Sequence, residues 1–128
     1  MKNILPLLSI LILISCKKEI NTDLTFEGEK YFKNIKQVTF GGDNAEAYWS
    51  FDDKQLVFQS NFNQWDVECD QMFLMNNDES FEVNTPKMLS TGKGRTTCSY
   101  FMPDNKHILY ASTHEADEAC PETPLRVD

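Results

Sequence analysis

Three cysteines in the second half of the chain, Cys69, Cys98 and Cys120, are the side chains with the most readable chemistry. Cys69 and Cys120 occupy equivalent places, within one residue, in two similar stretches that lie 52 residues apart, and Cys98 opens a strand of the second stretch. In an oxidising compartment one disulfide is expected. We predict the pair Cys98–Cys120, with Cys69 as the rival partner, and the third thiol pairs elsewhere or stays free.

Other chemistry finds little support in the spacing of the residues. A zinc site with His114 and Asp70 would lack Cys-x-x-Cys or His-x-x-x-His spacing. His107 and His114 are candidate bases in principle, but both are expected at the surface. The stretch Gly92–Thr97, GKGRTT, is glycine-rich like a phosphate loop without completing that motif. Because Gly-x-Ser-x-Gly and His-Glu-x-x-His are also missing, we predict no catalytic residue, metal or cofactor.

The remaining cysteine, Cys16, follows an apolar leader, MKNILPLLSILILISC. Lys2 precedes an apolar run over Ile4–Ile14, which is too short for a bilayer span of about 20 residues and suits a signal peptide. The end of the run, Leu13–Cys16, resembles the lipobox of bacterial lipoproteins. That resemblance implies cleavage before Cys16 and a lipid on its thiol. The alternative is an ordinary signal peptide that happens to contain a cysteine.

The lipobox resemblance also implies where the protein is located in the cell. Residues 1–15 would be removed, and residues 16–35 would form the lipidated N-terminus and a polar tether. Lys17 and Lys18 follow the cysteine, with no Asp at the second position, so we expect an outer-membrane lipoprotein. Whether it faces the periplasm or the cell surface stays open.

The charge of the chain restricts its partners. Lys and Arg number 12 against 20 Asp and Glu, which gives a net charge of −8. Such an acidic surface argues against nucleic acid, whose phosphates need basic side chains, and against adhesion to anionic lipid heads. We expect contact with the membrane through the lipid on Cys16, and a protein or peptide partner in the envelope.

Two stretches of the chain resemble each other at an offset of 52 residues. Ala47–Asn61 reads AYWSFDDKQLVFQSN, and Ser99–Thr113 reads SYFMPDNKHILYAST. Aromatic and β-branched runs alternate with turn residues, and no segment after the leader keeps a helical period. The strands predicted in the first repeat are Tyr48–Phe51, Gln55–Ser60, Gln71–Asn76 and Pro86–Thr91. The pattern therefore predicts an all-β chain.

The turns between these strands resemble those of TolB-like β-propellers, whose WD40-like repeats carry a Ser-Pro-Asp-Gly-Lys turn. The matching turns here are Ser50–Lys54 (SFDDK) and Met102–Lys106 (MPDNK), and Met75–Ser80 (MNNDES) is similar to a second turn of that family. The resemblance implies β-propeller blades of four antiparallel strands over residues 36–128.

The repeats account for only part of a ring. We expect a lone outer strand over Lys36–Phe40, one blade over Glu46–Thr91, and the first hairpin of another over Thr97–Thr113. This is about one and a half to two blades, an incomplete ring whose unpaired edges favour aggregation. We interpret the chain as the N-terminal piece of a longer protein. The alternative is a small sheet protein that oligomerises through its edges.

The family resemblance implies a non-catalytic envelope scaffold that binds proteins or peptides. The alternative is the N-terminal propeller fragment of a larger exported peptidase of the prolyl-oligopeptidase type. For the scaffold, we expect binding at the cysteine-bearing face, on four loops that hold polar and aromatic residues: Gly41–Ala45, Asn61–Asp70, Gly92–Thr97 and His114–Cys120. The candidate binding residues are Asp43, Asn44, Trp65, Arg95, Thr96 and His114.

Overall fold

The computed structural model describes residues 24–79 and 85–122, and these residues form an all-β structure with antiparallel sheets. The chain divides into two compact units, Met1–Lys36 and Gln37–Asp128. In the first unit, residues 24–36 contain turns but no strand or helix, and Phe26 and Tyr31 are exposed. The predicted leader and Cys16 lie outside the described residues. Within the described ranges, no helix is long and apolar enough to cross a membrane.

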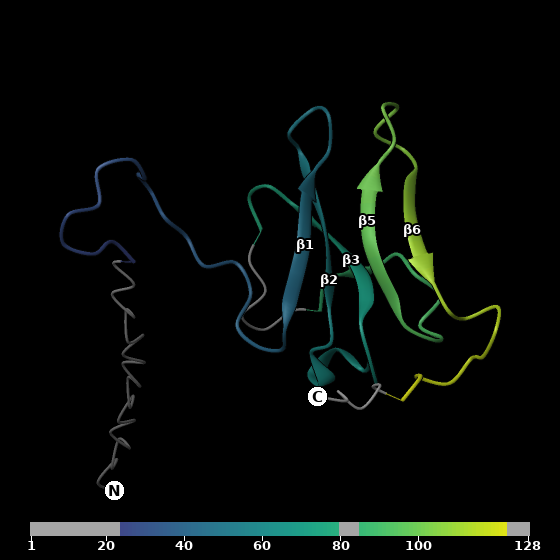
Figure 1. Cartoon of the computed structure of the whole chain (residues 1–128). Helices are drawn as coiled ribbons and strands as arrows, with labels where there is room; N and C mark the ends of the chain where they lie inside the picture. Colours follow the sequence, from purple (N-terminus) through teal and green to yellow (C-terminus); the bar gives the residue numbers. More distant parts are fainter. Residues whose placement is uncertain (1–23, 80–84, 123–128) are drawn as a thin grey trace, which may run out of the picture. The chain divides into compact units, whose positions relative to one another are not determined.

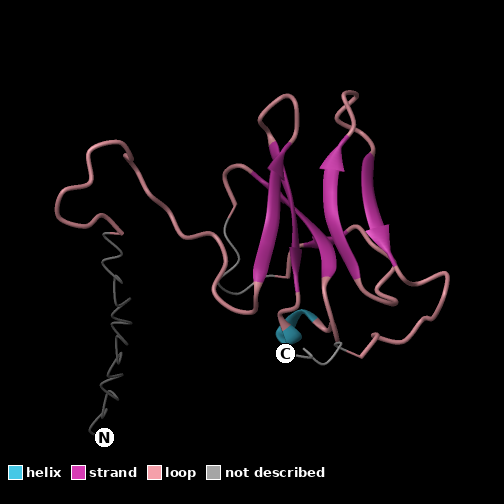
Figure 2. Cartoon of the chain, in the orientation of Figure 1, coloured by secondary structure: helices cyan, strands magenta, loops and turns pink. Residues whose placement is uncertain are grey.

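The second unit contains two antiparallel sheets (Figure 1). The first sheet has the order β1-β2-β3-β4, and the second is the hairpin β5-β6. The strands are β1 (Asn44–Trp49), β2 (Gln55–Ser60), β3 (Gln71–Asn76), β4 (Lys87–Met88), β5 (Thr96–Phe101) and β6 (Ile108–Ser112). A 3-10 turn, η1 (Asn63–Trp65), follows β2 (Figure 2).

The strands β2 and β3 have the predicted bounds, whereas the outer strands differ. β1 begins four residues earlier than predicted, at Asn44. The fourth strand, predicted over Pro86–Thr91, is reduced to Lys87–Met88, because the Met72 N–H donates to the Ser90 hydroxyl (2.9 Å) and not to a backbone carbonyl. The lone strand predicted over Lys36–Phe40 is wrong, since only Thr39 makes a bridge.

The two hairpins repeat the same backbone geometry at the offset of 52 residues. In β1 the register with β2 shifts at a bulge where Glu46 has φ 51°, and in β5 the register shifts where Cys98 has φ 53°. Left-handed backbone is uncommon for residues other than glycine, so its recurrence marks a specified bulge. The hairpin turns match as well, with Asp53 at φ 58° and Asn105 at φ 54°. The sequence repeat is therefore also a structural repeat.

An aspartate organises each of these turns. Asp104 accepts hydrogen bonds from the Lys106 N–H (2.9 Å), and from the His107 N–H (3.1 Å) and Nδ1 (2.6 Å). These donors, the Lys106 N–H first, lower the pKa of Asp104 to about 2. Asp52 takes the same place in the first hairpin, where the Ser50 hydroxyl is the main cause of its lowered pKa. This aspartate closes the turn, which explains its presence in both copies.

One face of the first sheet carries an aromatic cluster. Phe58 and Phe73 are cross-strand partners on this face, and both are buried with Met75. Trp65, from the turn after β2, covers them at ring-centroid distances of 6.2 Å to Phe58 and 5.1 Å to Phe73. Phe62 stacks edge-on against Trp65 at 5.3 Å. The loop after β2 thus closes this face.

On the opposite face of the first sheet packs β5, the first strand of the second hairpin, which contacts β1, β2 and β3 (Figure 1). Val57 and Met72 point to this side, and neither is exposed. At the edge of the contact, the rings of Tyr48 and Tyr100 stack at 5.4 Å. The two repeats therefore share a packed interface, to which polar side chains add a second set of contacts.

Candidate functional site

A disulfide joins the two repeats at the end where their loops gather. Cys69 bonds to Cys120 across 51 residues, with Cα atoms 5.9 Å apart. The predicted pair Cys98–Cys120 is thereby corrected, and Cys98 is a free, exposed thiol. The physical reason is that Cys98 lies at the bulge inside β5, whereas Cys69 and Cys120 lie in loops that meet at one end of the repeats. The bridge ties the loop after β2 to the loop after β6.

A hollow of about 290 Å³ lies beside this bridge, and we call it the disulfide pocket. Three loops line it: Asn63–Cys69 after β2, Gly92–Gly94 before β5, and Glu118–Cys120 after β6. Three of the four loops expected at the cysteine-bearing face thus meet here. The fourth, Gly41–Ala45, contributes no lining residue.

Gln71, the first residue of β3, holds the pocket wall in place. It is 2% exposed, and its amide bonds on both sides: Nε2 donates to the Gly94 carbonyl (2.7 Å), and Oε1 accepts from Ser90 Oγ (2.7 Å). The Gly94 N–H donates to the Glu118 carbonyl (2.8 Å). Gly94 has φ 59°, and a Cβ there would lie 2.7 Å from the His114 nitrogen. Only glycine fits, and the loop is anchored from both sides.

The rim of the disulfide pocket is acidic. Asp66, Glu68 and Glu118 line the pocket and are exposed. Lys93 Nζ lies 2.7 Å from Glu118 Oε1, in an ion pair whose two side chains are both more than half exposed. Exposed pairs of this kind contribute little to stability, about 0–1 kcal/mol. The ion pair therefore holds Lys93 at the rim only weakly.

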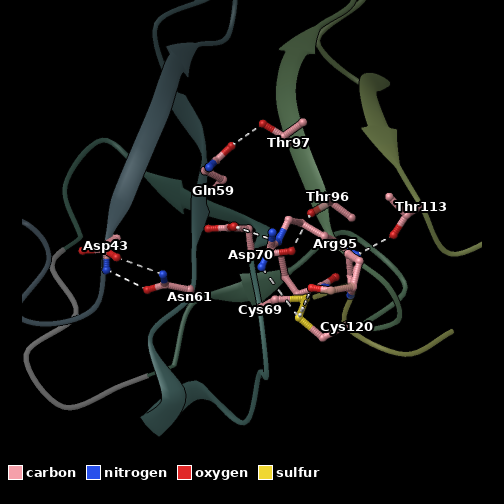
Figure 3. A network of polar contacts seen from close by, with 12 residues as sticks. Asp43, Gln59, Asn61, Cys69, Asp70, Arg95, Thr96, Thr97, Thr113 and Cys120 are labelled. Carbon is pink, nitrogen blue, oxygen red and sulfur yellow. Dashed lines mark hydrogen bonds and ion pairs between the residues drawn. A yellow bond between two sulfur atoms is a disulfide. The ribbon is translucent and has the colours of Figure 1, made fainter. Parts of the chain in front are cut away.

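Arg95 lies next to the disulfide pocket but serves the interface between the repeats (Figure 3). Its Nε lies 3.5 Å from Asp70 Oδ2, and its Nη2 lies 3.9 Å from Cys120 Sγ. The Asp70 carbonyl also accepts from the Thr96 N–H (2.9 Å). A third polar link, Thr97 Oγ1 to Gln59 Oε1 (2.8 Å), crosses the same interface. The position of the Arg95 guanidinium is therefore set by its contacts with Asp70 and Cys120 at the interface between the repeats.

Two predicted binding residues are corrected by their burial. Trp65 is 5% exposed and belongs to the aromatic cluster, and Thr96 is 0% exposed. Trp65 turns inward because η1 tightens the loop and Asp66 then adopts φ 59°. Neither side chain is accessible to a partner in this structure.

The other predicted residues are accessible but do not come together. Asp43 is exposed and pairs with Asn61, its N–H donating to Oδ1 (2.8 Å) and its Oδ2 accepting from Nδ2 (3.1 Å); Figure 3 places this pair apart from Arg95. Asn44 caps the preceding loop through the carbonyls of Gly41 and Gly42. His114 is half-buried, with Nδ1 2.7 Å from Ser112 Oγ. Each of these three residues makes hydrogen bonds in its own loop, and the three do not form one site.

The pocket residues Asp66, Glu68, Gln71 and Glu118 were not among the predicted site residues. Three of them lie in loops that the sequence analysis assigned to the binding face, and their closeness to Cys69 and Cys120 was the available signal. Gln71 could have been noticed as a polar residue opening an apolar strand. Among the described residues, no three His, Cys, Asp or Glu side chains are grouped to hold a metal ion.

Comparison with known proteins finds no relative of this chain: no family model matches it, and neither a curated protein nor a solved structure is similar to it.

Proposed function

We propose that this chain is a lipid-anchored scaffold of the cell envelope that binds a peptide segment with basic side chains in the disulfide pocket. The observation that carries the proposal is the pocket itself. It is a hollow formed by three loops, with an acidic rim and a wall held by Gln71 and the Cys69–Cys120 bridge. A site held rigidly before binding loses little conformational entropy when a ligand arrives.

The charge of the pocket favours a basic segment. Three carboxylates line the rim, from Asp66, Glu68 and Glu118, and no Lys or Arg is a lining residue. The net charge of −8 adds long-range attraction for cations. The carboxylates then select peptides with basic side chains.

The binding proposal is tested by peptide selection on the purified full chain with a displayed random decapeptide library. We expect enrichment of Lys- and Arg-containing peptides. The triple variant Asp66→Asn, Glu68→Gln, Glu118→Gln should bind the selected peptides roughly tenfold more weakly, because each exposed charge contact is worth up to about 1 kcal/mol. Isothermal titration calorimetry measures the Kd.

The matched control removes three exposed carboxylates elsewhere: Glu27→Gln, Asp53→Asn and Asp78→Asn. It changes the net charge equally and should leave the Kd within about twofold. Equal weakening by both triple variants would show bulk charge attraction and not a pocket. Failure to enrich any basic peptide would contradict the proposed ligand.

The propeller architecture is part of this proposal. The four-stranded antiparallel order β1-β2-β3-β4 and the packing of β5 onto one face of this sheet support it. So does the recurrence of bulge and turn 52 residues later. In a propeller, loops at one end of successive blades surround a shared mouth, which suits a peptide-binding scaffold.

Export and lipid attachment rest on the Leu13–Cys16 pattern, so labelling in cells tests them. When the full gene is expressed in bacteria with radiolabelled palmitate, the wild type should be labelled and Cys16→Ser should not. Cys98→Ser is the matched control, because it removes a free thiol without touching the lipobox, and its labelling should equal that of the wild type. Equal labelling of the Cys16→Ser variant would end the lipoprotein proposal.

A further inference from the structure

On two faces of the second unit, a residue is exposed although the equivalent residue of the other repeat is buried. Phe101 is 3% exposed, whereas Trp49, 52 residues earlier, is 50% exposed. Val57 is 0% exposed, whereas Leu109, 52 residues later, is 69% exposed. The register of the strands is the same in both copies, so these residues hold the same places in their hairpins. In each pair the buried member lies at the contact between the two repeats, and the exposed member does not.

The interface between the repeats shows what each surface packs against. The side of β5 that carries Phe101 lies on the first sheet, and the side of the first sheet that carries Val57 lies under β5. The opposite side of the first sheet is closed over Phe58 and Phe73 by the loop after β2. At its β1 edge this side still presents Trp49, beside a shallow apolar groove lined by residues such as Val38 and Leu56. The opposite side of the hairpin presents Leu109. The exposed surfaces around these two residues, the Trp49 face and the Leu109 face, are thus equivalent to the two halves of an interface that the chain already forms.

We propose that these two faces bind each other between copies of this chain, head to tail. The Trp49 face of one copy packs on the Leu109 face of the next, and it repeats the contact that joins the two hairpins within one copy. Tyr48 of one copy then meets Tyr100 of the other, as the two rings do inside the chain at 5.4 Å. Such a heterologous contact leaves one free face at each end, so it builds rings or open chains.

The charges at this interface make the association weak. Inside the chain, Arg95 pairs with Asp70. At the offset of 52 residues, Asp43 takes the place of Arg95 and Glu122 takes the place of Asp70. Two carboxylates therefore meet where the internal interface has an ion pair, and like charges oppose association. The variant Asp43→Arg restores opposite charges and should tighten the contact.

The test is sedimentation velocity of the full chain over a range of concentrations. The wild type should show concentration-dependent association, and Asp43→Arg should associate at severalfold lower concentration. Trp49→Glu and Leu109→Glu should each be monomeric, because a charge in the middle of an apolar contact is costly. Both positions are exposed, and circular dichroism of each variant should match the wild type.

Mixing the two monomeric variants is the decisive measurement. Trp49→Glu keeps its Leu109 face, and Leu109→Glu keeps its Trp49 face, so the mixture should form a one-to-one dimer that grows no further. Tyr31→Glu, at a 90% exposed aromatic residue in the first unit, is the control and should associate as the wild type does. A wild type that stays monomeric throughout would overturn the proposal. Variants that remain monomeric when mixed would overturn it as well.

Discussion

Removing the bridge with Cys69→Ala and Cys120→Ala is expected to lower the free energy of unfolding by about 4 kcal/mol. The bond closes a loop of 51 residues, and in the chain-entropy model a loop of that size restricts the unfolded chain by about this amount. The loss is large against the 5–15 kcal/mol that usually stabilises a domain. Equilibrium unfolding in urea, without reductant, measures it.

The control for the bridge is Cys98→Ala. This thiol is free and exposed, so its removal should change the free energy of unfolding by no more than about 0.5 kcal/mol. Adding a reductant to the wild type should reproduce the loss seen in the double variant. If Cys98→Ala is the destabilising change and the double variant is not, the pairing of Cys69 with Cys120 is wrong.

The inner strands could be predicted because their sequence and their environment agree. β2 and β3 are apolar runs bounded by turn residues, and both are paired on two sides. The repeat also predicted the turns, because Asp52 and Asp104 each accept hydrogen bonds from groups only a few residues away in the sequence. The sequence pattern therefore predicts the turns that local hydrogen bonds close and the apolar strands inside the sheet.

The outer strands and the site depend on contacts that are distant in sequence. β1 includes Asn44 and its neighbours, which are poor strand formers and are extended because they pair with β2. β4 stops where the Ser90 hydroxyl takes the Met72 N–H. The pocket wall depends on Gln71 reaching Gly94 across 23 residues. No local pattern encodes these partners.

The cysteine pairing shows the same limit. The offset of 52 residues placed Cys69 and Cys120 at equivalent points of successive repeats, which is where the bridge forms. It did not reveal that Cys98 belongs to a bulge inside β5, because a left-handed cysteine is unusual and has no sequence signal. The prediction therefore favoured Cys98 over Cys69, the partner that Cys120 has in the structure.

Trp65 was predicted to bind a partner, but because it is buried we expect it to contribute to stability instead. Trp65→Ala should lower the free energy of unfolding by about 3–5 kcal/mol, the usual range for removing a buried aromatic side chain. Its ring contacts Phe58, Phe62 and Phe73, so truncation leaves a cavity that rigid neighbours fill poorly. Urea unfolding followed by circular dichroism measures the change.

The second tryptophan provides the matched comparison. Trp49 is half exposed, so Trp49→Ala should cost about 1 kcal/mol or less at concentrations where the chain is monomeric. Native fluorescence separates the two further: Trp49→Ala leaves Trp65 as the only emitter, and a buried indole emits at shorter wavelength and is poorly quenched by iodide. Trp65→Ala leaves a quenchable emitter. If the two variants lose equal stability and quench alike, Trp65 does not lie in the core, and its role as a surface residue for binding would have to be restored.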